Sequence, residues 1–171
     1  MKTCIFEKFI IQDKISIDNS VLSWIETFDK EDNVNKSNRG GWQSRLLQQI
    51  PDRLSNEIEN CINRNFQSKL TVVSYWVNIN YPGSSNVEHI HPDSAISGCL
   101  YVTVPENSGN IVFVDKDYTI YDYSCGNLNT HSVKVTSGDI VFFKSNLPHY
   151  VEENKSDSNR ISIAFNCKVD L

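Results

Sequence analysis

Residues 71–80 read TVVSYWVNIN, a run in which β-branched and aromatic residues predominate. Such a composition favours an extended strand, and the next residues, 81–84 (YPGS), are typical of a turn. Further short runs of strand character follow at residues 97–104, 110–114, 118–123, 132–136, 139–143, 149–152 and 160–168. About eight short strands separated by regular turns predict a mainly β fold, either a sandwich or a barrel.

The chain before residue 70 has helical periodicity instead. Ser16 or Asp18 can cap a first helix, because apolar residues recur at helical spacing over residues 21–28. A second helix is expected to begin near Pro51, a residue that the first turn of a helix tolerates. The apolar stripe of that second helix would consist of Leu54, Ile58, Cys61 and Ile62. The N-terminal third is therefore expected to be helical.

No internal repeat, low-complexity tract or linker divides the chain. Residues 29–41 are polar, rich in Asn and end in Gly-Gly, which predicts a loop. A length of 171 residues is enough for one hydrophobic core. We therefore expect a single domain over residues 1–171, in which N-terminal helices (about 1–68) support a β core (about 69–171).

Composition and charge narrow the class of protein. A hydrophobic content of 39% and a charged content of 22% are typical of a globular chain. A net charge of −5 and a pI near 5.3 argue against general binding to nucleic acids or anionic membranes, which relies on clustered Lys and Arg. No apolar run approaches the roughly 20 residues that span a bilayer.

Cysteine usage indicates a reducing compartment. The five cysteines are widely spaced and form no CxxC pair, so they predict neither a disulfide framework nor a zinc ribbon. The N-terminal residues meet charge too early for a secretory signal. We therefore expect free thiols and a cytoplasmic location.

Three of the four histidines form a pattern with metal-ligand spacing. His89 and His91 lie in residues 87–93 (VEHIHPD), where alternate residues of a strand share a face. His149 follows the apolar run at 140–143, and Arg160 follows His149 by 11 residues. A lone histidine is usually a surface residue, but this combination predicts a metal site with a cation placed to bind a carboxylate. His131 fits no part of the pattern and is expected to face solvent.

Several short motifs in a fixed order resemble one enzyme superfamily. They are NYPG at 80–83, HIHP at 89–92, SGCLYV at 97–102, VTSGDIVFF at 135–143, His149, and RISIAFN at 160–166. In this order they resemble the Fe(II)/2-oxoglutarate-dependent oxygenases, and most of all a compact group of 2OG-Fe(II) oxygenases from bacteria and their viruses. The resemblance covers roughly residues 70–168, and GWQS at 41–44 resembles a segment before the core in that group.

The resemblance implies a double-stranded β-helix, a jelly-roll or cupin-like core of two facing antiparallel sheets. It also implies Fe(II) as cofactor, 2-oxoglutarate as cosubstrate and O₂ as oxidant. The implied reaction is a dioxygenase reaction, most simply hydroxylation of a peptidyl side chain or small molecule, with release of succinate and CO₂. The substrate itself is not identified by any segment of the sequence.

The resemblance also implies roles for individual residues. His149 matches the distal histidine ligand, and Arg160 matches the residue that pairs with the far carboxylate of 2-oxoglutarate. Ser162 lies on the same strand face as Arg160 and can add a hydroxyl. Tyr101 can place its hydroxyl on the cosubstrate, although a half-buried strand aromatic is an equally good interpretation.

The two ligands before His149 can be chosen in two ways. Most members of the superfamily use a His-x-Asp motif for these two ligands. In this sequence, His91-Pro92-Asp93 is a literal His-x-Asp. Alternatively, His89-Ile90-His91 takes the place of that motif. We favour His89 and His91, because the related group shares His-x-His-Pro without the following Asp. Asp93 would then orient a ligand rather than bind the metal. The loops at 29–41 and 116–129 are the expected lids over the site.

Two other functions are compatible with the sequence. A cupin-like protein could bind a divalent metal through three histidines without using 2-oxoglutarate. A barrel that has lost its metal could serve only as an interaction domain. Arg160 favours the oxygenase, because a cupin needs no cation at this distance from its last ligand.

Overall fold

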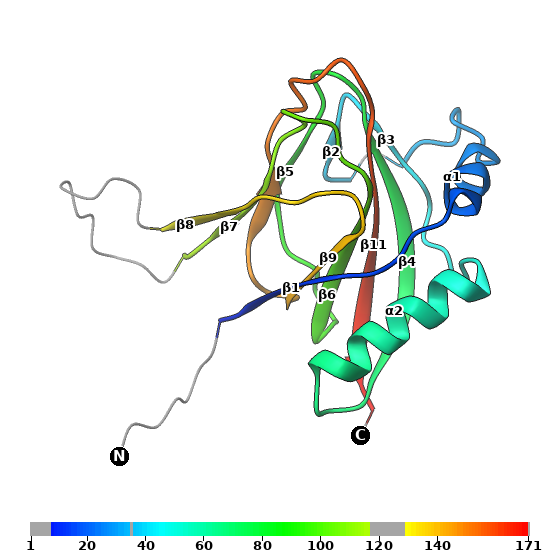
Figure 1. Cartoon of the computed structure of the whole chain (residues 1–171). Coiled ribbons are helices and arrows are strands. Elements are labelled where there is room, and N and C mark those ends of the chain that lie inside the picture. Colours follow the sequence, from blue (N-terminus) through cyan, green and yellow to red (C-terminus); the bar gives the residue numbers. More distant parts are fainter. Residues whose placement is uncertain (1–7, 35, 117–128, 171) are drawn as a thin grey trace.

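Two antiparallel β-sheets face each other in the computed structural model, which describes residues 8–34, 36–116 and 129–170 (Figure 1). The six-stranded sheet has the order β1 (Ile10–Lys14), β9 (Asp139–Lys144), β6 (Ile96–Thr103), β11 (Arg160–Val169), β4 (Leu70–Asn80) and β3 (Trp42–Gln43). The five-stranded sheet has the order β2 (Asn38–Arg39), β5 (Ser85–His89), β10 (His149–Val151), β7 (Ile111–Val114) and β8 (Thr130–Val133). This arrangement confirms the predicted mainly β fold with a double-stranded β-helix core.

Both predicted helices lie on the outer side of the six-stranded sheet (Figure 1). Helix α1 (Asn19–Glu26) begins after Asp18, whose carboxylate accepts a hydrogen bond of 2.9 Å from the backbone N–H of Ser20. Helix α2 (Asp52–Asn65) begins after Pro51. Its buried residues are those of the predicted stripe, Leu54, Ile58, Cys61 and Ile62. Each helix therefore buries one apolar face against the sheet.

Strand alternation divides the side chains of the six-stranded sheet between two apolar cores. On β11, Ile163 and Phe165 are fully buried in the core that the sheet shares with the helices. Arg160, Ser162 and Ala164 point to the other face, into the space between the sheets. The core between the sheets contains Tyr101, Ile111, Phe113, Val133, Val135, Val141, Phe143 and Leu147. Polar residues on β11 thus reach the interior without disturbing the helix-covered core.

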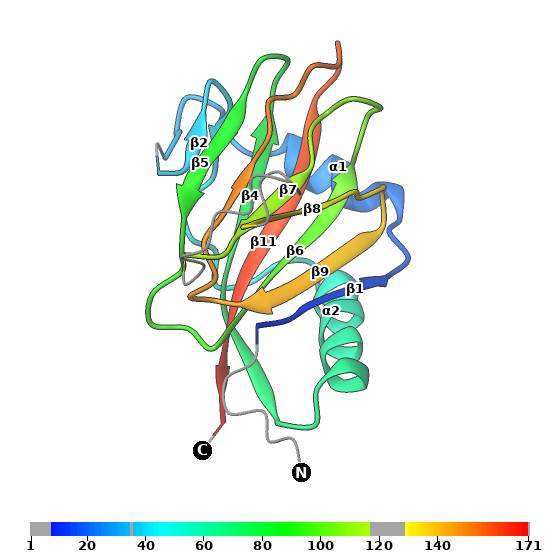
Figure 2. The same ribbon diagram turned by 90° about the vertical axis from the view of Figure 1, so that its left-hand side faces the viewer.

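Besides the two predicted helices, the N-terminal region contains three short strands, β1, β2 and β3, that the sequence did not predict. Strand β1 pairs along its whole length with β9 at the edge of the six-stranded sheet, from Ile10 opposite Phe143 to Lys14 opposite Asp139 (Figure 2). Strands β2 and β3 lie in and beside the expected loop at 29–41. They gain their hydrogen bonds from β5 and β4, far along the chain, which local periodicity cannot reveal.

The remaining predicted strands are present with small shifts at their ends, except that the run at 118–123 lies outside the described residues. Within the described residues, no helix combines the length and the apolar character that crossing a membrane requires.

Candidate metal centre

Three histidines from separate segments converge between the sheets. His89 ends β5 and His149 begins β10, and the two residues lie directly opposite each other in the ladder. His91 follows in the loop after β5, where its backbone N–H donates to the Ser145 carbonyl oxygen over 2.8 Å. One nitrogen atom from each ring lies within 4.8 Å of the others. The predicted convergence of the close pair with the later histidine is therefore present.

The hydrogen bonds of the three rings leave the same nitrogen free in each. Nδ1 of His89 lies 2.8 Å from the Val87 carbonyl oxygen, and Nδ1 of His149 lies 2.9 Å from that of Leu147. Nδ1 of His91 lies 2.8 Å from the side-chain Oδ1 of Asn166. Because these oxygens only accept, Nδ1 carries the hydrogen in each ring and Nε2 keeps its lone pair.

The free nitrogens fit a metal ion. Nε2 of His91 is buried and has no hydrogen-bond partner among the described residues. A buried polar atom without a partner is costly, so it points to a group that completes the site. Three imidazole nitrogens within reach of one cation are suitable ligands for iron and other divalent transition metals.

Burial keeps these imidazoles in the neutral form that binds metals. Removal from water lowers the pKa of His89, and it lowers the pKa of His91 to about 4. The pKa of His149 falls to about 3, first through burial and then through the two neighbouring imidazoles. All three rings are therefore uncharged near neutral pH.

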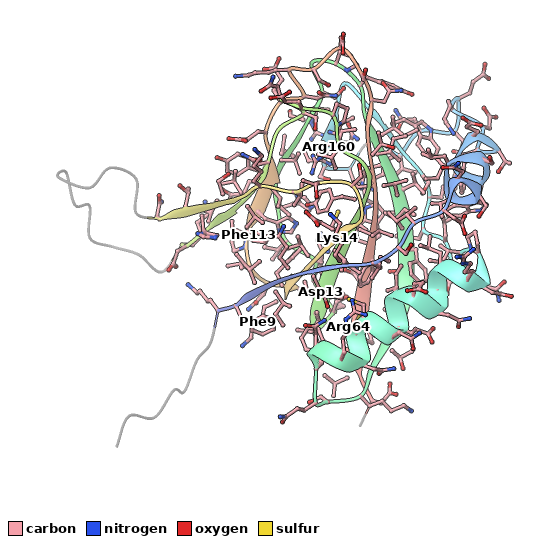
Figure 3. The ribbon with its side chains drawn as sticks, viewed as in Figure 1. Phe9, Asp13, Lys14, Arg64, Phe113 and Arg160 are labelled. Carbon is pink, nitrogen blue, oxygen red and sulfur yellow. The ribbon has the colours of Figure 1, made fainter. Side chains whose placement is uncertain are left out.

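Arg160 is a buried cation that has no carboxylate partner among the described residues. It is 1% exposed, and it forms none of the ion pairs found in the described part of the chain. Its Nε has no hydrogen-bond partner there, and its Cζ lies 5.0 Å from the centre of the Tyr101 ring. Figure 3 places it between the two sheets. A buried charge normally requires a partner, so this guanidinium is suited to bind an anion.

Tyr101 and Ser162 lie beside Arg160 as the strand pattern predicts. They are opposite each other on β6 and β11, and both are buried. The Tyr101 hydroxyl has no hydrogen-bond partner among the described residues. Burial raises the pKa of Tyr101 well above its usual value, so the phenol stays neutral and can donate a hydrogen bond.

One cavity joins the imidazoles to the guanidinium. His89, His91 and His149 line it together with Arg160, Tyr101, Ser162 and Asn78. None of the described residues that line it is acidic. The cavity therefore brings the three imidazoles and the guanidinium into one space.

Asp93 lies apart from this group. It is exposed, it sits in the turn after His91 with a backbone φ of 65°, and it is not among the residues whose ligand atoms converge. The structure thus brings together His89 and His91 rather than His91 and Asp93. Asn166 was not predicted from the sequence as part of the site. It lies at even separations from Arg160 and Ser162 on β11, which places the three side chains on one strand face.

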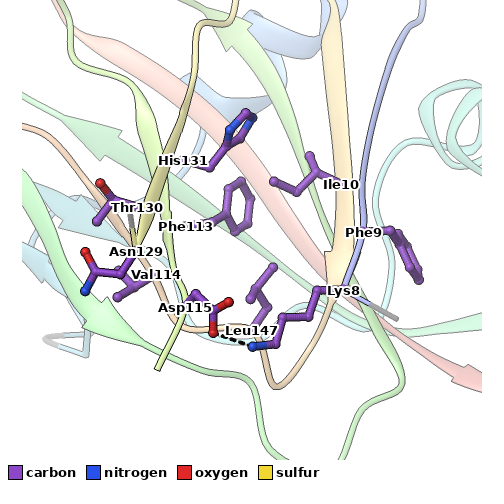
Figure 4. Close-up of a pocket in the computed structure, with 10 residues that line it drawn as sticks. All are labelled: Lys8, Phe9, Ile10, Phe113, Val114, Asp115, Asn129, Thr130, His131 and Leu147. Carbon is purple, nitrogen blue, oxygen red and sulfur yellow. Dashed lines mark hydrogen bonds and ion pairs between the residues drawn. The ribbon is translucent and has the colours of Figure 1, made fainter. Parts of the chain in front are cut away.

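A second cavity of about 300 Å³ opens between β1 and the ends of β7 and β8 (Figure 4). Phe113 and Leu147 line it, and an ion pair between Lys8 and Asp115 lies at its rim. Phe113 also contacts His149, with 5.9 Å between ring centres. The Phe113 ring therefore lies between the second cavity and His149. The exposed His131 lines this cavity and stands apart from the other histidines.

The sequence matches a family of known proteins. The family described as "Putative 2OG-Fe(II) oxygenase" matches residues 74–166, which is more than half of the 171 residues. The matched segment contains the three converging histidines, Tyr101, Arg160, Ser162 and Asn166. No curated protein matches the sequence.

Several solved structures share the fold. HygX from Streptomyces hygroscopicus, solved with nickel and 2-oxoglutarate bound, has a TM-score of 0.68 and 12% identity, with 95% of this chain and 83% of that chain covered. A prolyl-4-hydroxylase from Pseudomonas putida gives 0.64 and 13%, covering 95% and 93%. The viral collagen prolyl hydroxylase of Paramecium bursaria Chlorella virus-1, solved with 2-oxoglutarate, gives 0.62 and 16%, covering 95% and 97%. At these identities the likeness concerns the fold alone.

Proposed function

Because the chain belongs to the family of 2OG-Fe(II) oxygenases, we propose that His89, His91 and His149 bind its iron and that Arg160 binds its 2-oxoglutarate. Bound iron(II) and 2-oxoglutarate supply the O₂-consuming oxidation of this family, with release of succinate and CO₂. The residues of this chain would hold both groups, and burial keeps the imidazoles neutral.

The observation that supports this proposal most strongly is that two buried polar side chains in need of partners line one cavity. Nε2 of His91 and Nε of Arg160 are both buried without a partner among the described residues. A 2-oxoglutarate molecule has a metal-chelating end and a carboxylate at the other end. It would satisfy both groups at once. Ser162 and Tyr101 lie where their hydroxyls can donate to the same carboxylate.

Hydroxylation is the reaction we propose, with a peptidyl side chain as the substrate. Two of the structures with this fold are named prolyl hydroxylases, and 94% of this chain also matches a prolyl hydroxylase from Trichoplax adhaerens solved with a peptide fragment. A small organic substrate is the alternative within the same reaction class, since fold does not determine substrate.

Anaerobic titration with Fe(II) and 2-oxoglutarate tests the two sites together. The chelate gives a weak visible charge-transfer band. We expect this band in the parent protein and at least a tenfold weaker affinity for 2-oxoglutarate in Arg160→Ala. Arg45→Ala is the matched control, because Arg45 is exposed and pairs with the surface carboxylate of Asp32. The proposal predicts succinate release under O₂ from the parent protein and the Arg45 variant.

The same titration separates the oxygenase from its rival. A three-histidine metal protein that does not use 2-oxoglutarate would bind Fe(II) and give no charge-transfer band. Its Fe(II) affinity would not change in Arg160→Ala. The absence of acidic residues among the described lining residues is the feature that favours this rival. Failure to bind any divalent metal would instead leave only an interaction domain.

Two variants distinguish the alternative ligand sets. We expect His89→Ala to abolish tight Fe(II) binding and Asp93→Ala to leave it within about twofold, because Asp93 is exposed and outside the converging group. The reverse result would place the metal at His91 and Asp93.

We also propose that the protein acts as a single domain in the cytoplasm. Cys61, Cys99 and Cys167 are free thiols, as a reducing compartment would allow.

A further inference from the structure

Asn166 is the side chain that lies behind His91. Its Oδ1 lies 2.8 Å from Nδ1 of His91 and also accepts a hydrogen bond of 2.7 Å from the Ser97 hydroxyl. Asn166 and Ser97 are opposite each other on β11 and β6, so the backbone ladder fixes their separation. A rigid pair of strands therefore presents one amide oxygen to a histidine that lies in a loop.

The hydrogen bonds continue from this amide through two serine hydroxyls. The Ser145 hydroxyl lies 2.8 Å from that of Ser97. Since Ser97 donates its only hydroxyl hydrogen to Asn166, Ser145 must be the donor to Ser97. Both serines are buried, at 0% and 1% exposure, so water does not replace these bonds. In this arrangement the amide carbonyl oxygen faces both Ser97 and His91.

The orientation of the amide decides which nitrogen of His91 can bind a metal. With Oδ1 toward the ring, Nδ1 must carry the hydrogen and Nε2 is left as a ligand. If the amide were turned over, its N–H₂ group would donate to Nδ1 and the ring hydrogen would move to Nε2. That tautomer cannot bind a metal through Nε2.

His91 differs in this respect from the other two histidines. The Nδ1 hydrogens of His89 and His149 are held by backbone carbonyl oxygens, which no substitution removes. The backbone N–H of His91 is anchored to the Ser145 carbonyl oxygen, but its ring depends on a side chain. The partner is also a neutral amide, whereas metal-binding histidines often have a carboxylate there.

We infer that Asn166 is a positioning residue of the metal centre, and that it holds His91 in the orientation and tautomer that leave Nε2 free. This inference rests on the proposed function, because it takes His91 as a metal ligand. Ser97 and Ser145 support Asn166 from behind. Partners of this kind behind a ligating histidine typically change metal affinity by about 10–100-fold.

Co(II) titration of the metal-free protein, followed by its visible absorption, tests this inference without any turnover. Asn166→Leu keeps the size of the side chain and removes the acceptor, and we expect Co(II) binding to weaken at least tenfold. Asn166→Asp keeps both acceptor contacts and cannot donate, so it should bind Co(II) at least as tightly as the parent. The Co(II) affinity of Ser97→Ala should lie between those of the parent and Asn166→Leu.

Asn65→Leu is the matched control for stability. Asn65 is also partly buried, and it donates hydrogen bonds to Asp13 and to the Cys61 carbonyl oxygen, far from the histidines. We expect its thermal midpoint to fall and its Co(II) affinity to stay that of the parent. The inference is wrong if Asn166→Leu binds Co(II) like the parent, if Asn166→Asp is as weak as Asn166→Leu, or if Asn65→Leu weakens binding equally.

The result for His149→Ala separates this inference from the proposed function. If His149→Ala binds Co(II) as tightly as the parent, the metal centre itself is absent and the proposed function fails with it. If His149→Ala loses binding and Asn166→Leu does not, only the role of Asn166 is rejected.

Discussion

Burial is the main reason why the pKa values of His89, His91 and His149 all lie below the usual value for histidine. The same burial that readies these rings for a metal makes them costly to protonate in the folded protein. The unfolded chain has no such restriction. The difference between the two states couples proton binding to stability.

We expect the metal-free protein to lose stability as the pH falls. The pKa of His91 is about 4 in the folded state against 6.5 for an unperturbed histidine, so between about pH 6.5 and pH 4 mainly the unfolded state takes up this proton. Between about pH 7 and pH 5 the free energy of unfolding should fall by about 2 kcal/mol from this residue, and His149 should add to the loss. Urea unfolding at the two pH values measures it.

His91→Asn provides the control for that measurement, because Asn does not titrate in this range. Its pH dependence should be shallower than that of the parent. Equal slopes in the two proteins would show that His91 is not held neutral by the fold.

Much of the residue-level geometry of the site could be predicted from the sequence, because a strand period of two and a run of apolar residues are local signals. They place His89 and His91 on one face and put His149 and Arg160 at strand ends. Their roles as ligands stay predictions. The role of Asn166 could not be predicted, since its contact with His91 depends on the path of the loop between β5 and β6, which no local pattern indicates. Asp93 fell outside the site because the chain turns after Pro92.

At the scale of the elements, β6 depends on a residue without a side chain. Gly98 lies opposite Phe165 on β11, and a Cβ atom added at Gly98 would lie 2.1 Å from Cζ of that ring. Phe165 is fully buried and packs against Phe142, with 5.9 Å between ring centres. The ring therefore has little room to move aside.

We expect Gly98→Ala to destabilise the protein by about 1–3 kcal/mol, the usual cost of overpacking a dense core. Chemical denaturation of the two proteins measures the difference. In a Phe165→Leu background the same change should cost less, because the shorter side chain leaves space for the methyl group. An equal cost in both backgrounds would mean that the clash with Phe165 is not the cause.

The carboxylate of Asp13 on the edge strand β1 binds helix α2, beside a hydrogen bond of 2.9 Å from Arg64 Nη2 to the Lys14 carbonyl oxygen. Asp13 accepts hydrogen bonds of 2.7 Å from both Arg64 Nε and Asn65 Nδ2, and the bond from Arg64 is the first reason why the pKa of Asp13 lies well below its usual value (Figure 3). In the sequence, Arg64 and Asn65 lie 51 and 52 positions after Asp13. No local pattern indicates such a contact, which is why β1 was missed while both helices were predicted.

We expect Asp13→Asn to lower the free energy of unfolding by about 1–2 kcal/mol, toward the low end of charged hydrogen bonds because the side chain is 28% exposed. The loss should disappear at acid pH, where the parent carboxylate is protonated as well. Asp170→Asn is the comparison, since Asp170 also has a lowered pKa but lies at the surface beside Lys69 and Thr71. A loss no larger than that of Asp170→Asn would contradict the proposed attachment.

On the scale of the whole molecule, the residues proposed to bind the metal and 2-oxoglutarate belong to both sheets. His89 and His149 lie on β5 and β10 of the five-stranded sheet, whereas Arg160 lies on β11 of the six-stranded sheet. Asn166, also on β11, contacts His91. A metal ion with 2-oxoglutarate would therefore join the two layers at their centre. Its binding free energy should stabilise the entire fold rather than one loop.

We predict that the protein unfolds in one thermal transition and that Co(II) raises the midpoint of that transition as a whole. At a free metal concentration of 100 times Kd the gain is about 2.7 kcal/mol, which corresponds to roughly 5–10 °C for a chain of this size. Addition of 2-oxoglutarate should raise the midpoint further in the parent but not in Arg160→Ala, and a chelator should reverse both increases. His149→Ala should show neither, because it lacks a ligand from the five-stranded sheet. Two separate transitions, only one of them sensitive to metal, would mean that the sheets do not unfold together and that the metal stabilises only one of them.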